Sequence, residues 1–424
     1  MDRAALRVLP LMRHAHIIGA GVAGLSTAVH LLNRGWNVTL HESAGHAGGR
    51  CRSFEDAALG CRIDNGNHLL LSGNGAALEY LSLIDAADGL AGPDKAAFPF
   101  LDLETGRRWT VEMGAGRLPW WIFSETRRVP GSRPADYLRA LRLAWAGERA
   151  TVAECLGADN PLFKRFWEPL AVAVLNTAAE EGAASLLWPV IRETFGRGEA
   201  ACRPLIARVG LSESFVDPAL RFLAGRGVDF FANHRLRALS LEGDRVAALT
   251  FDGGDAAIAA GDAVVLAVPP GNAAELVPGL IVPDLSRAIV NGHFRLPAAS
   301  GDFSFLGLVG GVAQWLFVRG NVASVTVSAA DTLAEDHAAA IAERLWGEVR
   351  RALALGEAPL PAHRIVKEKR ATFAQTPDQV QRRPPTRTPW QNLFLAGDWT
   401  ATSLPATIEG AIRSGRKAAE TVVM

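Results

Sequence analysis

Hydrophobic positions near the start of the chain predict a strand, a helix and a second strand in close succession. Residues 16–18 form a short apolar run that leads into a glycine-rich turn, after which Leu25, Val29 and Leu32 recur at helical spacing. Residues 38–42 then follow as a strand that ends on a carboxylate. A strand, helix and strand within about 30 residues form the basic unit of parallel α/β folds.

The middle of the chain changes character twice. From about residue 73 to residue 200 the pattern is helical and rich in aromatic residues, with breaks at proline and glycine, which predicts a different domain. Short strands return at residues 235–241, 246–251 and 263–268. We expect these strands to form a meander that rejoins the first sheet.

The last part of the chain contains both strand-like and helical patterns. Residues 271–388 combine strand-like runs such as residues 323–328 with a helix near residues 338–353, and we assign them to the second domain. The chain then ends with an apolar strand at residues 392–396 and a helix from about residue 406. The first domain is therefore expected to be discontinuous.

These elements predict an α/β fold with two domains. A chain of 424 residues that is 49% hydrophobic has enough apolar material for two cores. We expect a Rossmann-like nucleotide-binding domain and a discontinuous α+β substrate-binding domain. The first comprises residues 1–72, 201–272 and 389–424, and the second comprises residues 73–200 and 273–388.

Charge and cysteine content narrow the possible partners. Lys plus Arg and Asp plus Glu both total 44, so the net charge is zero and nucleic acid is not expected as a partner. The four cysteines show no CxxC pair, which suits free thiols in a reducing compartment and argues against a metal site. They are Cys51, Cys61, Cys155 and Cys202.

No targeting or membrane-spanning segment is expected. Residues 1–15 are interrupted by Arg3, Arg7 and Arg13 and lead into a glycine turn, which is unlike a signal peptide. No stretch reaches the roughly 18 uninterrupted apolar residues of a spanning helix. The sequence therefore predicts a cytoplasmic protein, for which peripheral attachment to a membrane stays open.

The glycine turn predicts dinucleotide binding. In Gly19-Ala20-Gly21-Val22-Ala23-Gly24 the first glycine permits a tight turn, the second lets N–H groups approach a pyrophosphate, and the third allows helix and strand to pack closely. The start of the following helix adds a positive dipole. A glycine turn alone also fits an ordinary loop, but here a strand precedes it and a helix follows.

One acidic and one basic residue after the glycine turn extend the prediction of dinucleotide binding. Glu42, with Ser43 beside it, follows the second strand and is placed to bind ribose hydroxyls, and a carboxylate there favours a free 2′-hydroxyl. Further on, Gly48 and Gly49 let the backbone approach a ligand while Arg50 can donate to phosphate. Gly48, Gly49 and Arg50 also fit an ordinary surface turn with a solvated arginine.

Together these motifs resemble the amine oxidase and phytoene desaturase superfamily of FAD enzymes. The resemblance implies a glutathione-reductase-type FAD domain in which Gly48, Gly49 and Arg50 lie along the pyrophosphate. It also implies that residues 64–68 pass the flavin ring, with Gly66 beneath it and with Asn67 and His68 as candidates for catalysis and for flavin or substrate contact. A turn whose side chains only satisfy the backbone is an equal alternative for this segment.

A second flavin signature lies near the C-terminus. Gly397 and Asp398 follow an apolar strand, and the carboxylate can accept hydrogen bonds from sugar or ribityl hydroxyls. The next helix begins near residues 405–411, and its N–H groups can face the flavin O2 and N1 region. Its candidate flavin residues are Ile408, Glu409 and Ala411. In the superfamily an adenine contact falls near Leu236, whose side chain also fits plain core.

Several segments resemble one group of this superfamily more closely, the hydroxysqualene dehydroxylases of bacterial hopanoid pathways. They are spread over nearly the whole chain, and one departure is Ser403, where a glycine is expected before residues 404–407. The matching stretches are residues 64–68, 166–170, 175–177, 289–294, 368–373 and 396–400.

This resemblance implies reductive removal of the hydroxyl of hydroxysqualene, which gives squalene. Such a reaction needs a dry, long and aromatic site, for which Phe166 and Trp167 are the leading candidates, although aromatic residues at helical spacing also fit plain core. Only one dinucleotide motif is present, so either NAD(P)H binds transiently or a partner reductase reduces the flavin. The hydrophobic isoprenoid substrate predicts peripheral contact with the inner face of the membrane.

Two other functions stay open at this point. A carotenoid-type desaturase or an amine oxidase would use the same flavin motifs to remove hydride instead of delivering it. A prenyl-binding escort protein would keep the architecture and lose the flavin. The presence of the glycine turn together with Glu42, Arg50 and Asp398 argues against the second alternative.

Overall fold

One half of the molecule is built on a five-stranded parallel sheet. The computed structural model describes residues 13–298 and 304–424, so the expectation for residues 1–12 lies outside it. The strand order is β10-β2-β1-β14-β20, and every neighbouring pair is parallel. Its strands are β1 (His14–Ile18), β2 (Asn37–His41), β10 (Asp229–Phe231), β14 (Ala263–Leu266) and β20 (Leu393–Leu395).

Two helices from opposite ends of the sequence pack together on this sheet. They are α1 (Val22–Leu32) and α13 (Ile408–Val423). The Ser26 hydroxyl donates to the Ile412 carbonyl at 2.9 Å, and a Cβ at Gly415 would clash with the Ala23 carbonyl oxygen. The small residues on both helices therefore allow close backbone contact, which joins the two ends of the chain.

The predicted meander is wrong for two of its three strands. β11 (Leu236–Glu242) and β12 (Arg245–Phe251) pair antiparallel with β13 (Gly254–Ala257) in a separate sheet, and only β14 joins the parallel sheet. Burial is partial along β11 and β12, as in a sheet with one solvated face. All four positions of β14 are buried, as in a strand covered on both faces.

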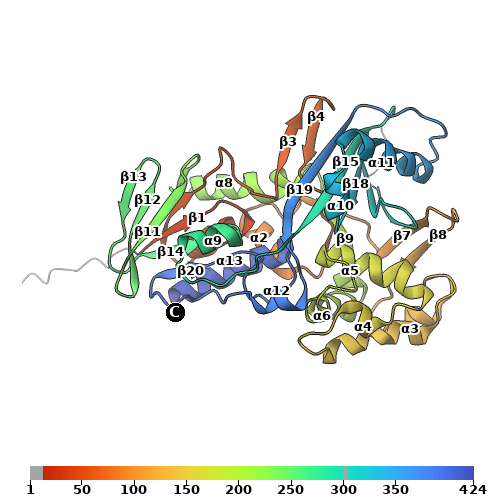
Figure 1. The fold of residues 1–424 in the computed structure, drawn as a ribbon, viewed down its shortest axis with the longest axis horizontal. Coiled ribbons are helices and arrows are strands. Elements are labelled where there is room, and N and C mark those ends of the chain that lie inside the picture. The colour runs from red at the N-terminus through yellow and green to blue at the C-terminus, as the bar shows by residue number, and fades with distance from the viewer. Residues whose placement is uncertain (1–12, 299–303) are drawn as a thin grey trace, which may run out of the picture.

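The other half is built on a seven-stranded sheet of order β19-β15-β18-β17-β16-β7-β8. Figure 1 shows its two longest strands, β15 and β19, running from the parallel sheet toward the far end of the molecule. Helix α11 (Ala338–Ala352) packs against these strands. The strands are β7 (Ala97–Asp102), β8 (Arg108–Glu112), β15 (Ser286–Arg295), β16 (Ser304–Val309), β17 (Trp315–Arg319), β18 (Val322–Val327) and β19 (His363–Phe373).

The helical pattern predicted for residues 73–200 misses the strands near the start of that segment. β7 and β8 form a hairpin, and β7 adds to the large sheet through parallel pairing with β16. Burial in β8 alternates strictly, which is the period of a strand, but the hairpin occupies only a short part of a helix-rich segment. The helices that follow are η1 (Trp120–Phe123), α3 (Pro134–Leu138), η2 (Arg139–Trp145), α4 (Val152–Leu156), η3 (Phe163–Trp167), α5 (Glu168–Leu175), α6 (Ala184–Glu193), η4 (Phe195–Arg197) and α7 (Glu199–Cys202).

Smaller elements connect the two halves. The strands β3 (Ser53–Asp56) and β4 (Cys61–Asp64) form a hairpin, and a further three-stranded sheet has the order β5-β9-β6. The strands of this sheet are β5 (Leu70–Leu71), β6 (Leu90–Ala91) and β9 (Pro204–Ala207). The remaining helices are α2 (Gly75–Leu83), η5 (Ser212–Val216), α8 (Asp217–Ala224), α9 (Pro270–Leu276), α10 (Asp331–Glu335) and α12 (Pro377–Gln381).

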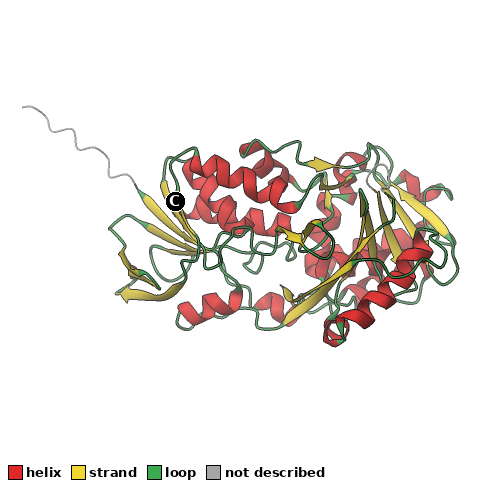
Figure 2. Ribbon diagram, turned by 90° about the horizontal axis from the view of Figure 1, so that it is seen from above, coloured by secondary structure: helices red, strands yellow, loops and turns green. Residues whose placement is uncertain are grey.

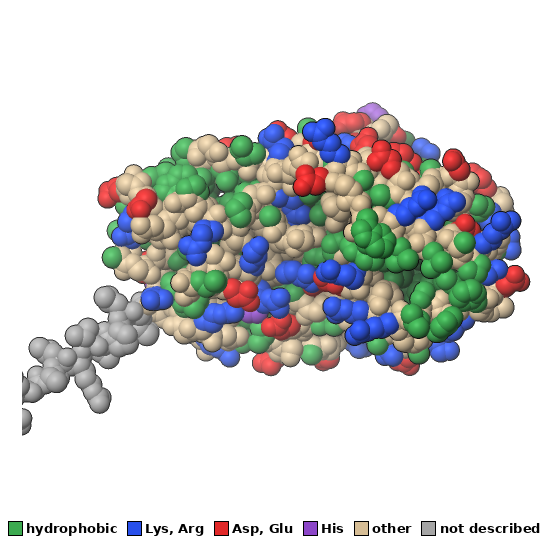
Figure 3. Space-filling view, turned by 90° about the horizontal axis from the view of Figure 1, so that it is seen from below, with side chains coloured by type: hydrophobic (Ala, Val, Ile, Leu, Met, Phe, Trp, Pro, Cys, Tyr) green, Lys and Arg blue, Asp and Glu red, His purple; other side chains and the backbone are tan. Residues whose placement is uncertain are grey.

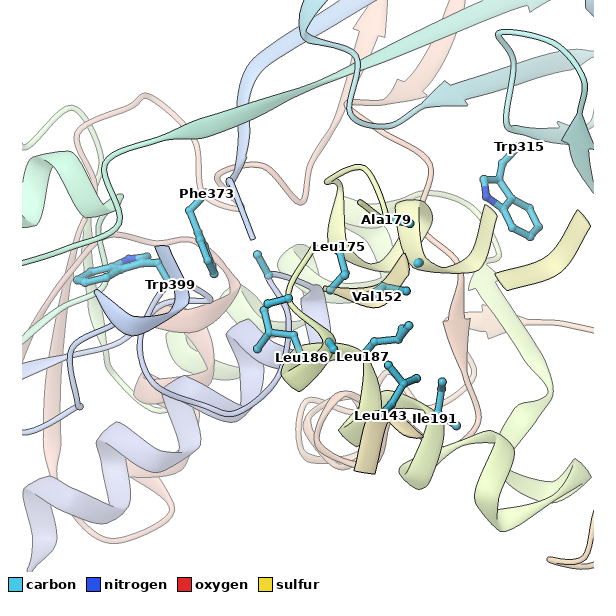
Figure 4. Close-up of a cluster of buried hydrophobic side chains, with 14 of the residues drawn as sticks. Leu143, Val152, Leu175, Ala179, Leu186, Leu187, Ile191, Trp315, Phe373 and Trp399 are labelled. Carbon is cyan, nitrogen blue, oxygen red and sulfur yellow. The ribbon is translucent and has the colours of Figure 1, made fainter. Parts of the chain in front are cut away.

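A single buried hydrophobic cluster reaches from one half to the other. It includes Trp399 beside the parallel sheet, Leu175 and Leu187 in the helical segment, and Trp315 on the large sheet. Figure 4 shows Phe373 and Trp399 close together at one end of the cluster and Trp315 at the other, with the helices between them. Viewed from above, the helices and sheets of both halves form one elongated body (Figure 2). No helix among residues 13–298 and 304–424 is long and apolar enough to cross a bilayer.

Candidate functional site

The glycine turn between β1 and α1 requires glycine at two of its three positions. Gly19 has a φ of +106°, and a Cβ there would clash with the Ala267 carbonyl oxygen. A Cβ at Gly24 would clash with the Gly19 carbonyl oxygen. Both glycines are therefore needed to bring the strand, the turn and the helix together.

Gly21 differs from its neighbours because its missing side chain leaves open space. A Cβ at Gly21 would have no protein atom within 4 Å. Gly21 is also the N-cap of α1 and offers no side chain to the first N–H groups of the helix. The start of α1, with its free N–H groups and positive dipole, thus borders open space at Gly21, and this arrangement fits a pyrophosphate.

Glu42 lies over this turn. Its carboxylate accepts the Ala20 N–H and the Ala44 N–H, each at 2.8 Å, and the Ser43 hydroxyl donates to it at 3.2 Å. The first of these bonds fixes the end of β2 to the glycine turn. A carboxylate has about four acceptor positions, so capacity remains for ribose hydroxyls.

The second glycine pair brings a third segment to the turn. The Gly48 N–H donates to the Ala20 carbonyl at 2.8 Å, and Gly48 and Gly49 have φ values of +100° and +58°. Arg50 follows, and its Nη2 lies 2.8 Å from the Asp398 Oδ2. The three predicted segments, separated by almost the whole sequence, therefore meet in space.

The C-terminal turn is held by residues that the sequence did not reveal. Gly397 has a φ of +150°, and its N–H donates to the Ser414 hydroxyl on α13 at 2.8 Å. The guanidinium of Arg383 is buried and donates to the carbonyls of Asp398 and Leu404 at 3.0 and 2.8 Å. Burial lowers the pKa of Arg383 to about 10, and the nearby Asp398 partly opposes this. It also donates to the Thr402 hydroxyl at 3.0 Å. No local motif marks Arg383, because two of its three acceptors are backbone carbonyls.

The candidate residues of α13 divide into two groups. Thr407 caps the helix by accepting the Gly410 N–H at 3.1 Å, and the Ala411 N–H bonds to the Thr407 carbonyl. The N–H groups of Ile408 and Glu409 have no acceptor within the helix and are available to a flavin. The Glu409 carboxylate is not available, because it accepts the N–H groups of Ala76 and Ala77 at the start of α2, at 3.1 and 2.8 Å.

Ser403, which stands where the family pattern predicts glycine, has a backbone conformation that favours glycine. Its φ is +62°, in the left-handed region that favours glycine. We expect Ser403→Gly to raise the free energy of unfolding by about 0.5–1 kcal/mol, because glycine enters this region without strain. Urea denaturation of both proteins measures the change. A Ser403→Gly variant that unfolds more easily would contradict this explanation.

The turn at residues 64–68 packs against two strands of the large sheet. Asn67 Nδ2 donates to the Thr326 hydroxyl at 3.1 Å, and this hydroxyl donates to Asn291 Oδ1 at 2.8 Å. Asn291 Nδ2 in turn lies 3.3 Å from the Asn65 carbonyl, and a Cβ at Gly66 would lie 3.3 Å from the same nitrogen. The polar turn is therefore fixed to β15 and β18.

A small recess adjoins this turn. Its cavity volume is about 20 Å³, and Asp64, Asn67, His68, Arg319 and Ser324 are among its lining residues. Asp64 is buried and forms an ion pair with Arg319 at 2.7 Å. Burial lowers the pKa of His68 to about 4, with Asp64 partly opposing the shift. A neutral imidazole at pH 7 favours a hydrogen-bonding role for His68 over that of a general acid.

A second histidine lies close by. His293 is buried on β15, and its Nδ1 lies 2.8 Å from the Ser324 hydroxyl. Its Nε2 has no hydrogen-bond partner in the described part of the chain. Burial lowers the pKa of His293 to about 4. Residues 289–294 were singled out by resemblance alone, and the isolated histidine gave no indication of this position.

Buried and half-buried histidines predict a steep loss of stability in weak acid. Burial lowers the pKa of His16, His68 and His293 to about 4 and that of His41 to about 3, against 6.5 when exposed. The unfolded chain therefore binds more protons below about pH 6.5, and each group contributes stability that is present above pH 6.5 and lost toward pH 4. The slope per histidine reaches about 1.4 kcal/mol per pH unit.

Urea denaturation at pH 7.5 and pH 5.5 measures this effect. His41 stacks on Phe251 at a centroid distance of 4.6 Å, so His41→Phe is the matched variant that removes one titrating group. We expect a smaller difference between the two pH values for this variant. Equal unfolding free energies of the unmodified protein at both pH values would contradict the prediction.

One row of side chains crosses the large sheet from this polar turn. The strand register places Asn291, Thr326, Trp315, Gly307, Phe100 and Trp109 opposite one another on successive strands. Residues in register point to the same face of a sheet. A Cβ at Gly307 would lie 2.5 Å from the Phe100 ring, so the glycine makes room for it. The row is polar beside Asn67 and aromatic beyond Thr326.

The predicted substrate residues lie over this row. Phe166 on η3 contacts the Phe100 ring edge-on at a centroid distance of 6.3 Å, and Trp167 contacts Phe166 at 4.9 Å. The indole N–H groups of Trp109, Trp167 and Trp315 are buried without an acceptor among the described residues. Leu236, predicted near adenine, starts β11 with its side chain in the core cluster.

Comparison with known proteins assigns the family. The model of the family described as flavin containing amine oxidoreductase matches residues 22–299 and 317–423. A hydroxysqualene dehydroxylase from Rhodopseudomonas palustris is 48% identical over 97% of this chain and 99% of that protein. One from Sinorhizobium fredii is 46% identical over 96% and 98% of the two chains. The chain belongs to the hydroxysqualene dehydroxylase family of flavin-containing oxidoreductases.

More distant relatives share the fold. An oxidoreductase of known structure from Methanosarcina mazei superposes with a TM-score of 0.71 at 13% identity and covers 96% of this chain and all of that one. A zeta-carotene desaturase from a Synechocystis species is 22% identical over 96% of both chains. Identity to the hydroxysqualene dehydroxylases is thus about twice as high as to this desaturase.

Part of the hydroxysqualene dehydroxylase pattern is structural. Asn176 has a φ of +47°, and its Nδ2 donates to the Thr372 hydroxyl at 3.0 Å. The buried Gln375 donates to the Leu175 carbonyl at 2.6 Å and accepts the Ala406 N–H at 2.8 Å. Residues 175–177 therefore tie the helical segment to β19 and to the loop before α13, whereas residues 64–68 and 289–294 meet at the candidate site.

Proposed function

We propose that the chain is an FAD-dependent oxidoreductase that removes the hydroxyl of hydroxysqualene and yields squalene and water. The parallel sheet would be the glutathione-reductase-type FAD domain. In this proposal the pyrophosphate lies at Gly21 and Arg50, the ribose at Glu42, and the ribityl chain near Asp398. The open space at Gly21 and the convergence of these residues support a long dinucleotide ligand.

The row of side chains that crosses the large sheet supports the proposal for the substrate. An isoprenoid alcohol has one polar end and a long apolar remainder, and the row has the same order, from Asn291 and Thr326 to Phe100 and Trp109. Trp315 is buried at the boundary, next to Thr326 in register, with its N–H unpaired. We propose that this N–H donates to the substrate hydroxyl.

The chemistry places separate demands on the chain. The C–O bond breaks with its electron pair on oxygen, a proton converts the hydroxide into water, and a hydride forms the new C–H bond. A reduced flavin, when bound, supplies the hydride. The chain must hold the hydroxyl and exclude bulk water, and the buried aromatic side chains over the row serve both needs. Either NAD(P)H binds transiently as reductant or a partner reductase delivers the electrons.

Anaerobic turnover tests the proposal. We expect reduced enzyme to convert hydroxysqualene to squalene, detected by mass spectrometry, with no added double bonds. A protein that instead desaturates a polyene in its oxidised state would be a carotenoid-type desaturase, and oxidation of an amine would identify an amine oxidase. A purified protein without flavin absorbance would revive the escort alternative.

Trp315→Phe should lower turnover about tenfold, the effect of one lost hydrogen bond of about 1.4 kcal/mol. Trp109→Phe is the matched control, because it removes an equally buried and unpaired N–H on the other side of Phe100. Equal effects of the two substitutions would contradict the role of Trp315.

Unchanged turnover in both His68→Ala and Asn67→Ala would remove those residues from catalysis.

A further inference from the structure

We propose that η1, α3 and η2 form a docking surface for an anionic lipid bilayer. Six large hydrophobic side chains in these helices and just before η1 are between 49% and 80% exposed, and we call them the apolar patch. They are Leu118, Trp120, Phe123, Leu138, Leu141 and Trp145. Figure 3 shows hydrophobic side chains gathered at this end of the molecule, with Lys and Arg side chains near them. Contiguous exposed apolar surface of this kind marks an interaction site.

The apolar patch is displayed by a fixed scaffold. Trp120 and Phe123 lie side by side at a centroid distance of 6.0 Å, while Trp121 between them is buried. Trp121 contacts the buried Tyr137 ring edge-on at 5.1 Å, and the Val129 N–H donates to the Tyr137 hydroxyl at 2.9 Å. Buried residues thus anchor η1 and α3, while the exposed residues beside them point outward.

Charge complementarity selects a lipid surface as the occupant. Residues 115–149 contain seven arginines and three acidic residues, a net charge of +4 in a chain whose net charge is zero. Arg117, Arg133, Arg142 and Arg149 are exposed and form no ion pair within the described ranges. Exposed tryptophan and leucine surrounded by arginine match the interface of a bilayer that contains anionic lipids.

The apolar patch is also continuous with the proposed substrate site. From Trp121 and Tyr137, ring contacts continue to Phe166 at 6.3 Å, from Phe166 to Phe100 at 6.3 Å, and from Phe100 to Trp315 at 5.7 Å. An apolar substrate that leaves the bilayer would therefore remain among aromatic side chains. This part of the inference rests on the proposed function, whereas binding to lipid does not.

Vesicle co-sedimentation of the flavin-loaded protein tests the docking surface. The vesicles contain phosphatidylcholine alone or mixed with phosphatidylglycerol. We expect partition to rise at least about tenfold with the anionic lipid and to fall at high salt. Trp120→Ser, Phe123→Ser and Trp145→Ser combined should reduce it at least about tenfold. The matched control combines Val209→Ser, Ile281→Ser and Leu285→Ser, which are similarly exposed elsewhere.

Each outcome has one meaning. An unmodified protein that stays in the supernatant, or equal losses in both triple variants, would overturn the docking surface. Concentration-dependent dimerisation that only the patch variant abolishes would assign the surface to a second copy instead. Turnover of detergent-dispersed hydroxysqualene should be equal in all three proteins, and turnover from vesicles should fall only in the patch variant. Failure of the detergent reaction in all three would overturn the proposed function and leave the lipid result unaffected.

Discussion

Replacing Gly21 by aspartate is expected to give a folded protein that cannot hold a flavin. The residue has φ −68° and ψ 171°, which any residue adopts, and a Cβ there meets no protein atom. Aspartate is a better N-cap than glycine, so α1 should gain a few tenths of a kcal/mol. A carboxylate about 4 Å from a pyrophosphate charge costs about 4 kcal/mol, or roughly a thousandfold in affinity.

Flavin absorbance per chain and urea denaturation of the flavin-free protein separate these two effects. Gly21→Asn is the matched control, because it has the same shape without the charge and should retain more flavin than Gly21→Asp. Gly24→Ala provides the opposite case, since its Cβ would clash with the Gly19 carbonyl oxygen and destabilise the flavin-free protein. Full flavin content in Gly21→Asp would refute the placement of the pyrophosphate.

Removal of the Glu409 carboxylate is expected to destabilise the protein by about 3–5 kcal/mol. The side chain is buried, accepts two N–H groups of α2 and pairs with Arg413 at 2.9 Å. Glu409→Ala would leave these donors without their acceptor. The sequence placed Glu409 at the flavin, so this variant also distinguishes a structural role from a cofactor contact.

Glu409→Gln is the informative partner of that variant. It keeps one acceptor oxygen for α2 and loses the charge that pairs with Arg413, but Arg413 keeps its ion pair with Glu193 at 2.7 Å. We therefore expect a smaller loss in unfolding free energy than for Glu409→Ala. Flavin affinity should change only as far as α13 is disturbed. If Glu409→Gln weakened flavin binding while the flavin-free protein unfolded as before, the carboxylate would be a cofactor ligand and the structural role would be wrong.

The sequence predicted the site best where chemistry depends on the backbone. Gly19, Gly24 and Gly397 could be placed because tight turns and close packing allow little else at these positions. Long-range partners could not be placed in this way. Arg383 binds carbonyl oxygens, which every residue possesses, and Arg319 meets Asp64 only through the fold.

Strand pairing was the weaker part of the fold prediction. The sequence pattern of β11 and β12 is that of strands, but it does not show which sheet they join. Their partial burial fits a separate sheet with one solvated face, and this burial could not be predicted from the local sequence. β7 and β8 were missed because their membership in the large sheet depends on parallel pairing with β16, some 200 residues later. The aromatic row across that sheet became visible only with its register.

The packing of α1 on α13 has a consequence for biosynthesis. In the nascent chain α1 emerges well before α13, so the apolar face of α1 has no complete cover until α13 has been synthesised. At about 5–20 residues per second, this interval lasts tens of seconds. Because Asp398 lies shortly before α13, the proposed flavin site is also incomplete during this interval, and the uncovered face of α1 is exposed to aggregation.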